Sequence, residues 1–176
     1  MPASDDGRSS AELVLGIDPG LIVCCWGLVT AATPPRYVAC GAIRPRAKDA
    51  IGSRLLHLHD AITAVIAEHG PSHVAIEEQF VSALDPRSAL AIGQARAAAV
   101  MAAARAGLDV SFYTPAAVKS AVSGYGQSDK RQVQAMVRML LRLEADPQPA
   151  DAADALAIAL THLANRKAAA LLEIRG

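Results

Sequence analysis

The sequence predicts an α/β fold, in which a mixed five-stranded sheet carries helices on both faces. Three observations predict it. Three apolar, strand-like runs follow one another closely near the start of the chain, so they should pair antiparallel. Two later strand-like runs are each preceded by a segment with helical periodicity, and such crossovers make their strands parallel to the first. Helical segments alone make up the rest of the chain.

The strands are expected where short aliphatic runs end at turn residues. Pro19-Gly20 and Thr33-Pro34-Pro35 are turn signals that separate the first three runs. The five strands are predicted at 13–18, 22–29, 37–43, 73–76 and 109–114.

The helices are expected where apolar residues recur every three or four positions. Gly70-Pro71 ends the first helix, Ser88 is a plausible N-cap of the second, and Pro115 opens the third. The five helices are predicted at 53–69, 88–107, 116–122, 129–143 and 150–172.

The length of 176 residues fits one domain, which we place at 12–176. Residues 1–11 are polar and contain no apolar run typical of a signal peptide, so we expect a disordered tail. No apolar run reaches the length of a membrane span. The three cysteines lack metal-ligand spacing, which predicts buried free thiols and a cytoplasmic protein.

Charge is unevenly distributed, although the formal net charge is zero. Between Arg105 and Arg142 there are six basic residues and two acidic ones, a net charge of +4. Such a segment can bind phosphates, and it can equally be an ordinary solvated helix face. The sequence leaves both interpretations open.

Four carboxylates stand where aliphatic or small residues would be expected. Asp18 ends the first strand and Glu77 follows the fourth, which should lie beside the first at about 4.8 Å. Asp151 and Asp154 are three residues apart at the start of the last helix and should share one face. Acids also suit a first helical turn, and Asp18 also suits a turn before Pro19.

Four converging carboxylates would repel one another unless cations neutralise them. An all-oxygen ligand set without convergent His or Cys indicates Mg²⁺ or Mn²⁺. Two such ions, roughly 4 Å apart, are the arrangement used for in-line phosphoryl displacement. The sequence therefore predicts Asp18, Glu77, Asp151 and Asp154 as a two-metal hydrolytic site.

Four blocks of sequence resemble the RuvC family of bacterial Holliday-junction resolvases. They are Leu-Gly-Ile-Asp-Pro-Gly at 15–20, Ala-Ile-Glu at 75–77, Gly-Gln-Ala-Arg at 93–96, and Asp-Ala-Ala-Asp-Ala-Leu-Ala-Ile-Ala at 151–159. The resemblance covers about 13–162. It implies a ribonuclease H-like fold and a homodimer that places symmetric, Mg²⁺- or Mn²⁺-dependent nicks in four-way DNA junctions during recombination and repair. It also implies delivery by a branch-migration complex of the RuvA and RuvB type.

Further site residues follow from the resemblance only. It implies that Asp18, Glu77, Asp151 and Asp154 are the catalytic, metal-binding residues. Lys119 and Lys130 match lysines that the family uses for DNA handling and cleavage. Phe80 matches an aromatic residue that the family presents to the junction, where it could stack on a base.

The chain departs from the family pattern at two places. Residues 21–25, Leu-Ile-Val-Cys-Cys, replace polar residues beside Asp18. Glu78 stands where glutamine is expected, and we expect it to point away from Glu77 because neighbours on a strand face opposite sides. Arg96 could face either DNA or solvent.

Three other functions are alternatives to a junction endonuclease. A related nuclease that trims RNA ends should lack the two lysines around a glycine-containing loop. An ATP-binding module of the actin or sugar-kinase type needs a second phosphate loop and a longer chain. A junction-binding protein without catalysis should lack one of the four carboxylates.

Overall fold

The computed structural model describes residues 12–78 and 86–173. Its sheet contains β1 (Leu13–Asp18), β2 (Cys24–Thr30), β3 (Arg36–Ile43), β4 (His73–Glu77) and β5 (Val110–Tyr113). Its helices are α1 (Ile51–His69), α2 (Pro86–Arg105), α3 (Pro115–Ser123), α4 (Lys130–Leu140) and α5 (Ala152–Glu173).

The strand order is β3-β2-β1-β4-β5. β1 pairs antiparallel with β2, and β2 pairs antiparallel with β3. β1 pairs parallel with β4, and β4 pairs parallel with β5. This topology confirms the predicted mixed sheet, including the position of β1 beside β4.

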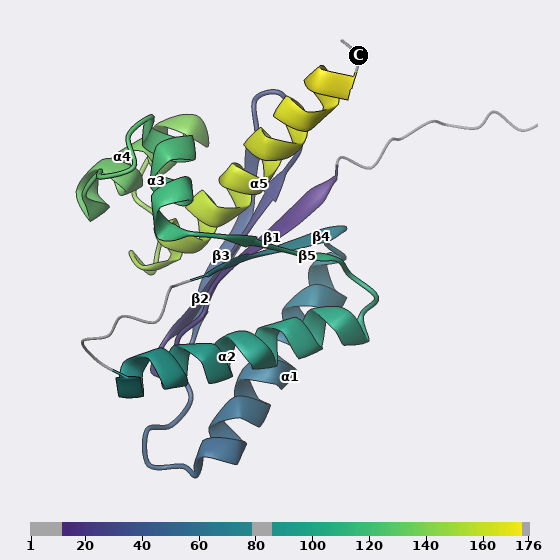
Figure 1. The fold of residues 1–176 in the computed structure, drawn as a ribbon, viewed down its shortest axis with the longest axis vertical. Helices are drawn as coiled ribbons and strands as arrows, with labels where there is room; N and C mark the ends of the chain where they lie inside the picture. Colours follow the sequence, from purple (N-terminus) through teal and green to yellow (C-terminus); the bar gives the residue numbers. More distant parts are fainter. Residues whose placement is uncertain (1–11, 79–85, 174–176) are drawn as a thin grey trace, which may run out of the picture.

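Helices cover both faces of the sheet, as predicted (Figure 1). α1 and α2 pack on one face, and α5 lies on the other with α3 and α4 beside it (Figure 1). Side chains alternate along β1, so Leu15 and Ile17 belong to the core beneath α1 and α2, while Val14 belongs to the core beneath α5.

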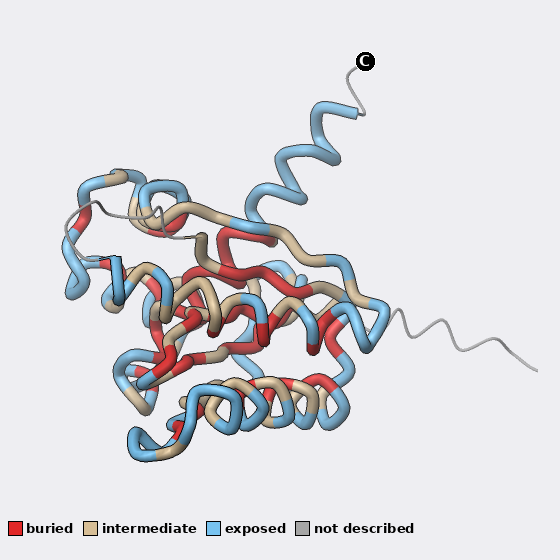
Figure 2. Tube along the Cα trace, turned by 60° about the horizontal axis from the view of Figure 1, so that its bottom comes forward, coloured by how far each residue is buried: buried red, intermediate tan, exposed pale blue. Residues whose placement is uncertain are grey.

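Two strand glycines let α5 approach the sheet closely. A Cβ atom on Gly16 would overlap the carbonyl oxygen of Ala155, and one on Gly27 would lie 2.8 Å from the side chain of Leu156. The half of α5 that crosses the sheet is buried, and its C-terminal half projects beyond the sheet and is exposed (Figure 2).

Local sequence signals explain where the helices around the site begin. Thr114 caps α3 by accepting a hydrogen bond from the backbone of Ala117, and Pro115 occupies the first turn. Asp129 and Gln132 form a reciprocal capping box at the start of α4. These caps fix the first residues of α3 and α4, and therefore the positions of Lys119 and Lys130 on these helices.

Some predicted boundaries were wrong. β2 begins at Cys24 and not at residue 22, because the turn that begins at Pro19-Gly20 extends further. α4 ends at Leu140 and not at 143, and Arg142 adopts a left-handed backbone with φ 53°. α5 begins at Ala152, so Asp151 lies just before the helix.

The predicted tail at 1–11 lies outside the described residues. Within residues 12–78 and 86–173, no helix combines the length and apolar character needed to span a bilayer. Cys24, Cys25 and Cys40 are free thiols, and the first two are buried, as predicted. Cys40 is only partly buried.

Candidate active site

Two neighbouring strands place two carboxylates at one edge of the sheet. Asp18 is the last residue of β1, and Glu77 is the last residue of β4. Ile17 and Ile76 are register partners in this parallel pair. Asp18 and Glu77 are the next residue of each strand, so they lie side by side, one strand spacing apart. Both continue the side of the sheet that faces α5, because Val14 and Ala75 belong to that core.

The last helix brings further acids to the same edge. α5 lies directly on β1 at Gly16, and its first turn contains Asp154. A cavity of about 240 Å³ opens there. Its walls come from the two strand ends, α3, α4 and α5, and its polar lining residues are Asp18, Glu77, Lys119, Lys130 and Asp154.

Lys130 links the two acids at the start of α5. Its Nζ lies 2.8 Å from Asp151 Oδ1 and 3.1 Å from Asp154 Oδ2. The hydrogen bond from Lys130 lowers the pKa of Asp151, and the same bond raises the pKa of Lys130. Asp151 therefore joins the site through Lys130, although it does not line the cavity.

The pKa of Asp18 is strongly perturbed by its surroundings. Burial, followed by the negative charges of Glu77 and Asp154, raises its pKa to about 7. Lys130 acts in the opposite direction, but its effect is smaller. Three acids line the cavity against two lysines, so the site holds more negative charge than Lys119 and Lys130 compensate.

The donor chemistry of this site fits a hard divalent cation. Asp18, Glu77, Asp151 and Asp154 offer only carboxylate oxygens, and a cation would relieve the repulsion that raises the pKa of Asp18. As the side chains stand, the described residues contain no group of three or more acidic, His or Cys side chains close enough to hold one ion. Lys130 lies between Asp151 and Asp154, so metal binding there requires its ammonium group to move.

Other predicted residues have different outcomes. Lys119 lines the cavity, and its ammonium group makes no ion pair with a described residue. Phe80 lies outside the described residues, so its predicted role stays a prediction. Glu78 points away from Glu77 as expected, since it forms an ion pair of 3.5 Å with Arg96 on α2. Arg96 therefore holds Glu78, and its guanidinium also lies 6.0 Å from the ring centroid of Phe112.

Two residues that shape the site were not identified from the sequence. Gly16 allows α5 to lie against β1, and the signal was a glycine within an aliphatic strand, which marks a close backbone approach. Arg44, the residue after β3, is near enough to contribute to the lowered pKa of Asp151. The basic residues at 44–48 were visible in the sequence, but their proximity to Asp151 depends on the register of β2 and β3.

The atypical segment 21–25 contributes apolar packing beside Asp18. Leu21 is buried, and its carbonyl oxygen accepts a hydrogen bond of 2.8 Å from Arg54. Burial raises the pKa of Cys24 to about 12 and that of Cys25 to about 11, so both remain neutral thiols. Ile22 is 77% exposed at the same edge of the sheet.

Comparison with known proteins gives one consistent result. Residues 14–162 match the family described as crossover junction endodeoxyribonuclease RuvC. A RuvC of that description from Salinispora arenicola is 49% identical over 152 residues, which cover 85% of this chain and 86% of that protein. Another from Chromohalobacter salexigens is 47% identical over 171 residues, covering 97% and 90%.

Solved structures agree with this result. The RuvC of Thermus thermophilus in complex with a Holliday junction substrate superposes with a TM-score of 0.84 at 34% identity, covering 90% of this chain and 96% of that one. The yeast mitochondrial Holliday junction resolvase Ydc2 has a TM-score of 0.64 at 13% identity, which is a likeness of fold.

Proposed function

The chain belongs to the RuvC family of crossover junction endodeoxyribonucleases, and we propose that its carboxylate cavity is where a Holliday junction is cut. The observation that supports this site is that Asp18, Glu77 and Asp154 line one cavity, in which Lys130 forms an ion pair with Asp154. The charge that raises the pKa of Asp18 is charge that a catalytic cation would compensate.

RuvC-family nucleases depend on divalent metal ions. We propose Mg²⁺ or Mn²⁺, two ions per site, held by Asp18, Glu77, Asp151 and Asp154. Bound ions of this kind activate water and stabilise the attacking and leaving oxygens of a phosphodiester. The carboxylates would fix where the scissile phosphate lies, because they extend from two neighbouring strand ends and from the start of α5.

The two lysines have separate roles in this proposal. Lys119 faces the cavity without an ion pair to a described residue, so its ammonium group can bind a phosphate oxygen of the substrate. Lys130 bridges Asp151 and Asp154 and can turn towards substrate phosphate once those acids bind a cation. Both positive charges would stabilise the charge that develops on the phosphate. Phe80 is proposed to stack on a base at the junction.

Two symmetric nicks in one junction require two sites, so we propose that the protein acts as a homodimer. α2 offers a suitable surface, because Leu90 and Met101 on it are both 64% exposed. We further propose that the enzyme acts in the cytoplasm, in recombination and DNA repair, with a branch-migration complex of the RuvA and RuvB type.

The test is cleavage of a synthetic four-way junction with Mg²⁺ or Mn²⁺. Wild type should nick two opposing strands of the same polarity. Asp18→Asn should cut at least about 100-fold more slowly, as expected when a charge at the reacting centre is lost. Glu78→Gln is the matched control, since Glu78 is the neighbouring acid on the other face of the sheet and should leave the rate unchanged.

The two parts of the proposal fail separately. If wild type leaves the junction intact with either ion, junction cutting by this chain is wrong. If Asp18→Asn cuts as fast as wild type, the cavity is not the catalytic site, although the function itself would stand.

A further inference from the structure

Half of the basic residues between Arg105 and Arg142 gather on one side of α4. A cavity of about 660 Å³ is lined there by Arg131, Gln134, Arg138, Met139, Arg142 and Asp146. Arg131 and Arg138 are seven residues apart, so they lie on one helix face about 10 Å from each other. α4 lies at the outside of the helical layer that it forms with α3 and α5 (Figure 1).

The three arginines differ in what they bind within the protein. Arg138 donates hydrogen bonds to the carbonyl oxygens of Leu143 and Glu144 and lies 3.7 Å from Asp146, so it holds the segment that follows the helix. The guanidinium groups of Arg131 and Arg142 make no hydrogen bond or ion pair with any residue of 12–78 or 86–173. Two cations therefore remain available to a ligand.

Arg142 occupies a backbone position that normally favours glycine. It follows Leu141, the C-cap of α4, with φ 53° in the left-handed region. Glycine is the usual residue just after a helix C-cap, because it has no Cβ to strain this conformation. A strained arginine beside a cavity is an observation that points to a function for its side chain.

The cavity begins close to the carboxylate site. Lys130, which contacts Asp151 and Asp154, directly precedes Arg131. From Lys130 the helix rises about 12 Å to Arg138, and Arg142 lies further along. One DNA strand advances about 3.4 Å per nucleotide, so these arginines span about one to five nucleotides from a phosphate held at the carboxylates.

We propose that this side of α4 binds the phosphodiester backbone of the junction arm next to the cleavage point, through Arg131 and Arg142. Three arginines and one aspartate give the cavity a net positive charge, which is complementary to DNA. The inference rests on the proposed function, because it takes the carboxylate cavity as the place of the scissile phosphate.

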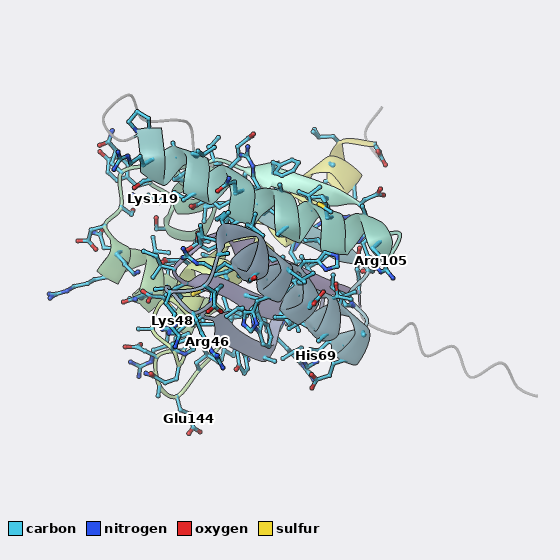
Figure 3. All side chains as sticks on the ribbon, turned by 90° about the horizontal axis from the view of Figure 1, so that it is seen from below. Arg46, Lys48, His69, Arg105, Lys119 and Glu144 are labelled. Atoms are coloured by element: carbon cyan, nitrogen blue, oxygen red, sulfur yellow. The ribbon has the colours of Figure 1, made fainter. Side chains whose placement is uncertain are left out.

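The first experiment measures junction binding in the Asp18→Asn background with Mg²⁺, so that the DNA stays uncut. Adding Arg131→Ala and Arg142→Gly should weaken binding roughly 10-fold at 0.1 M salt. The slope of log affinity against log salt should fall by about 2, because about 0.9 is lost for each phosphate contact. Arg105→Ala is the control, since Arg105 belongs to the same basic segment but lies at the opposite end of the molecule from Lys119 (Figure 3).

Arg142→Gly alone separates binding from folding. The glycine relieves the left-handed backbone, so the melting temperature should rise by about 2–4 °C while junction affinity falls. If Arg142 did not contact DNA, the melting temperature would still rise, but the junction affinity would stay unchanged.

Neutral methylphosphonate linkages then locate the contact. Placed about one to five nucleotides from the cleavage point, they should weaken binding by the protein with both arginines and leave the double variant unaffected. Unchanged affinity and salt slope in the double variant would overturn the inference, and would instead fit an acidic protein as ligand. Because binding is measured without cleavage, a wild type that fails to cut affects the proposed function alone.

Discussion

The carboxyl group of Asp18 is largely buried and lies close to other negative charges. Asp18 ends an aliphatic strand, and it shares its cavity with Glu77 and Asp154, while the ion pairs that Lys130 forms with described residues are to Asp151 and Asp154. The sequence could identify Asp18 because a carboxylate in an aliphatic run costs free energy that folding alone does not return.

The raised pKa of Asp18 predicts that the free energy of unfolding depends on pH. The pKa of Asp18 is about 7 in the folded protein and near 3.8 in the unfolded chain, so the folded state binds more protons between these values. The contribution of Asp18 to the free energy of unfolding therefore falls as pH rises from 4 to 7. Without metal, Asp18→Asn should be more stable than wild type by up to about 4 kcal/mol at pH 8 and equal to it near pH 4.

Urea unfolding of both proteins in EDTA, from pH 4 to pH 8, measures this difference. Asp109→Asn is the control, because Asp109 is an exposed aspartate that does not line the carboxylate cavity. A constant difference between wild type and Asp18→Asn would show that Asp18 titrates normally.

The role of Lys130 shows where residue-scale prediction ends. The resemblance identified it as a residue that handles DNA, yet in the structure it bridges Asp151 and Asp154, which are 21 and 24 positions away. That contact depends on how α4 packs against α5, and no local pattern encodes it. Arg96 is similar, since its partner Glu78 follows a different element.

At the scale of elements, the approach of α5 to β1 decides whether the site forms. Gly16→Ala would drive a methyl group into the carbonyl oxygen of Ala155, so α5 must shift and move Asp154 away from Asp18. The expected loss is at least about 2 kcal/mol of unfolding free energy together with most of the cleavage activity.

Chemical unfolding and junction cleavage test this, with Gly52→Ala as the matched control. Gly52 lies in α1, and a methyl group added there would meet no atom within 4 Å, so alanine should stabilise by about 0.5–1 kcal/mol. Equal unfolding free energies and cleavage rates for the two variants would mean that α5 can move away from β1 without loss of stability or activity.

The exposed face of α2 is the element to test for the proposed homodimer. Leu90 and Met101 are each 64% exposed, and with Ala97 between them they lie on one side of the helix. Met101→Lys should shift the protein towards monomer in light scattering, because a charge would be buried in the interface. Leu56→Lys on α1, where leucine is 60% exposed, should leave the mass unchanged. A monomeric wild type, or a dimeric Met101→Lys, would place the dimer contact elsewhere or exclude it.

For the whole molecule, periodicity and connection length were enough to predict strand order and layers. Short links predicted the antiparallel β1, β2 and β3, and helical crossovers predicted parallel β4 and β5, which the structure confirms. Two of the boundaries that were wrong lie at 22–23 and 141–143, where Ile22, Val23, Leu141 and Leu143 continue the apolar pattern although the backbone turns. Composition cannot show such turns, because they are fixed by local backbone geometry.

Metal binding should stabilise the whole folded molecule. Cation binding to the folded carboxylate cluster, but not to the unfolded chain, should raise the melting temperature of wild type by about 5–10 °C at 100 times the dissociation constant. Asp154→Asn should lose most of this increase, and Glu78→Gln should retain it. Thermal melts with and without Mn²⁺ decide the matter, and equal increases in all three proteins would indicate binding elsewhere.

The order in which the chain contributes to the cavity has a consequence for its synthesis. β1 supplies Asp18 early and β4 supplies Glu77 next, but Asp154 arrives with α5, the last helix. α5 also covers the apolar side of the sheet centred on Val14, Val29 and Ala75. A nascent chain that stops short of α5 thus lacks both a covered sheet and a complete set of acids. Translation itself delays the ability to cut DNA until α5 has been made.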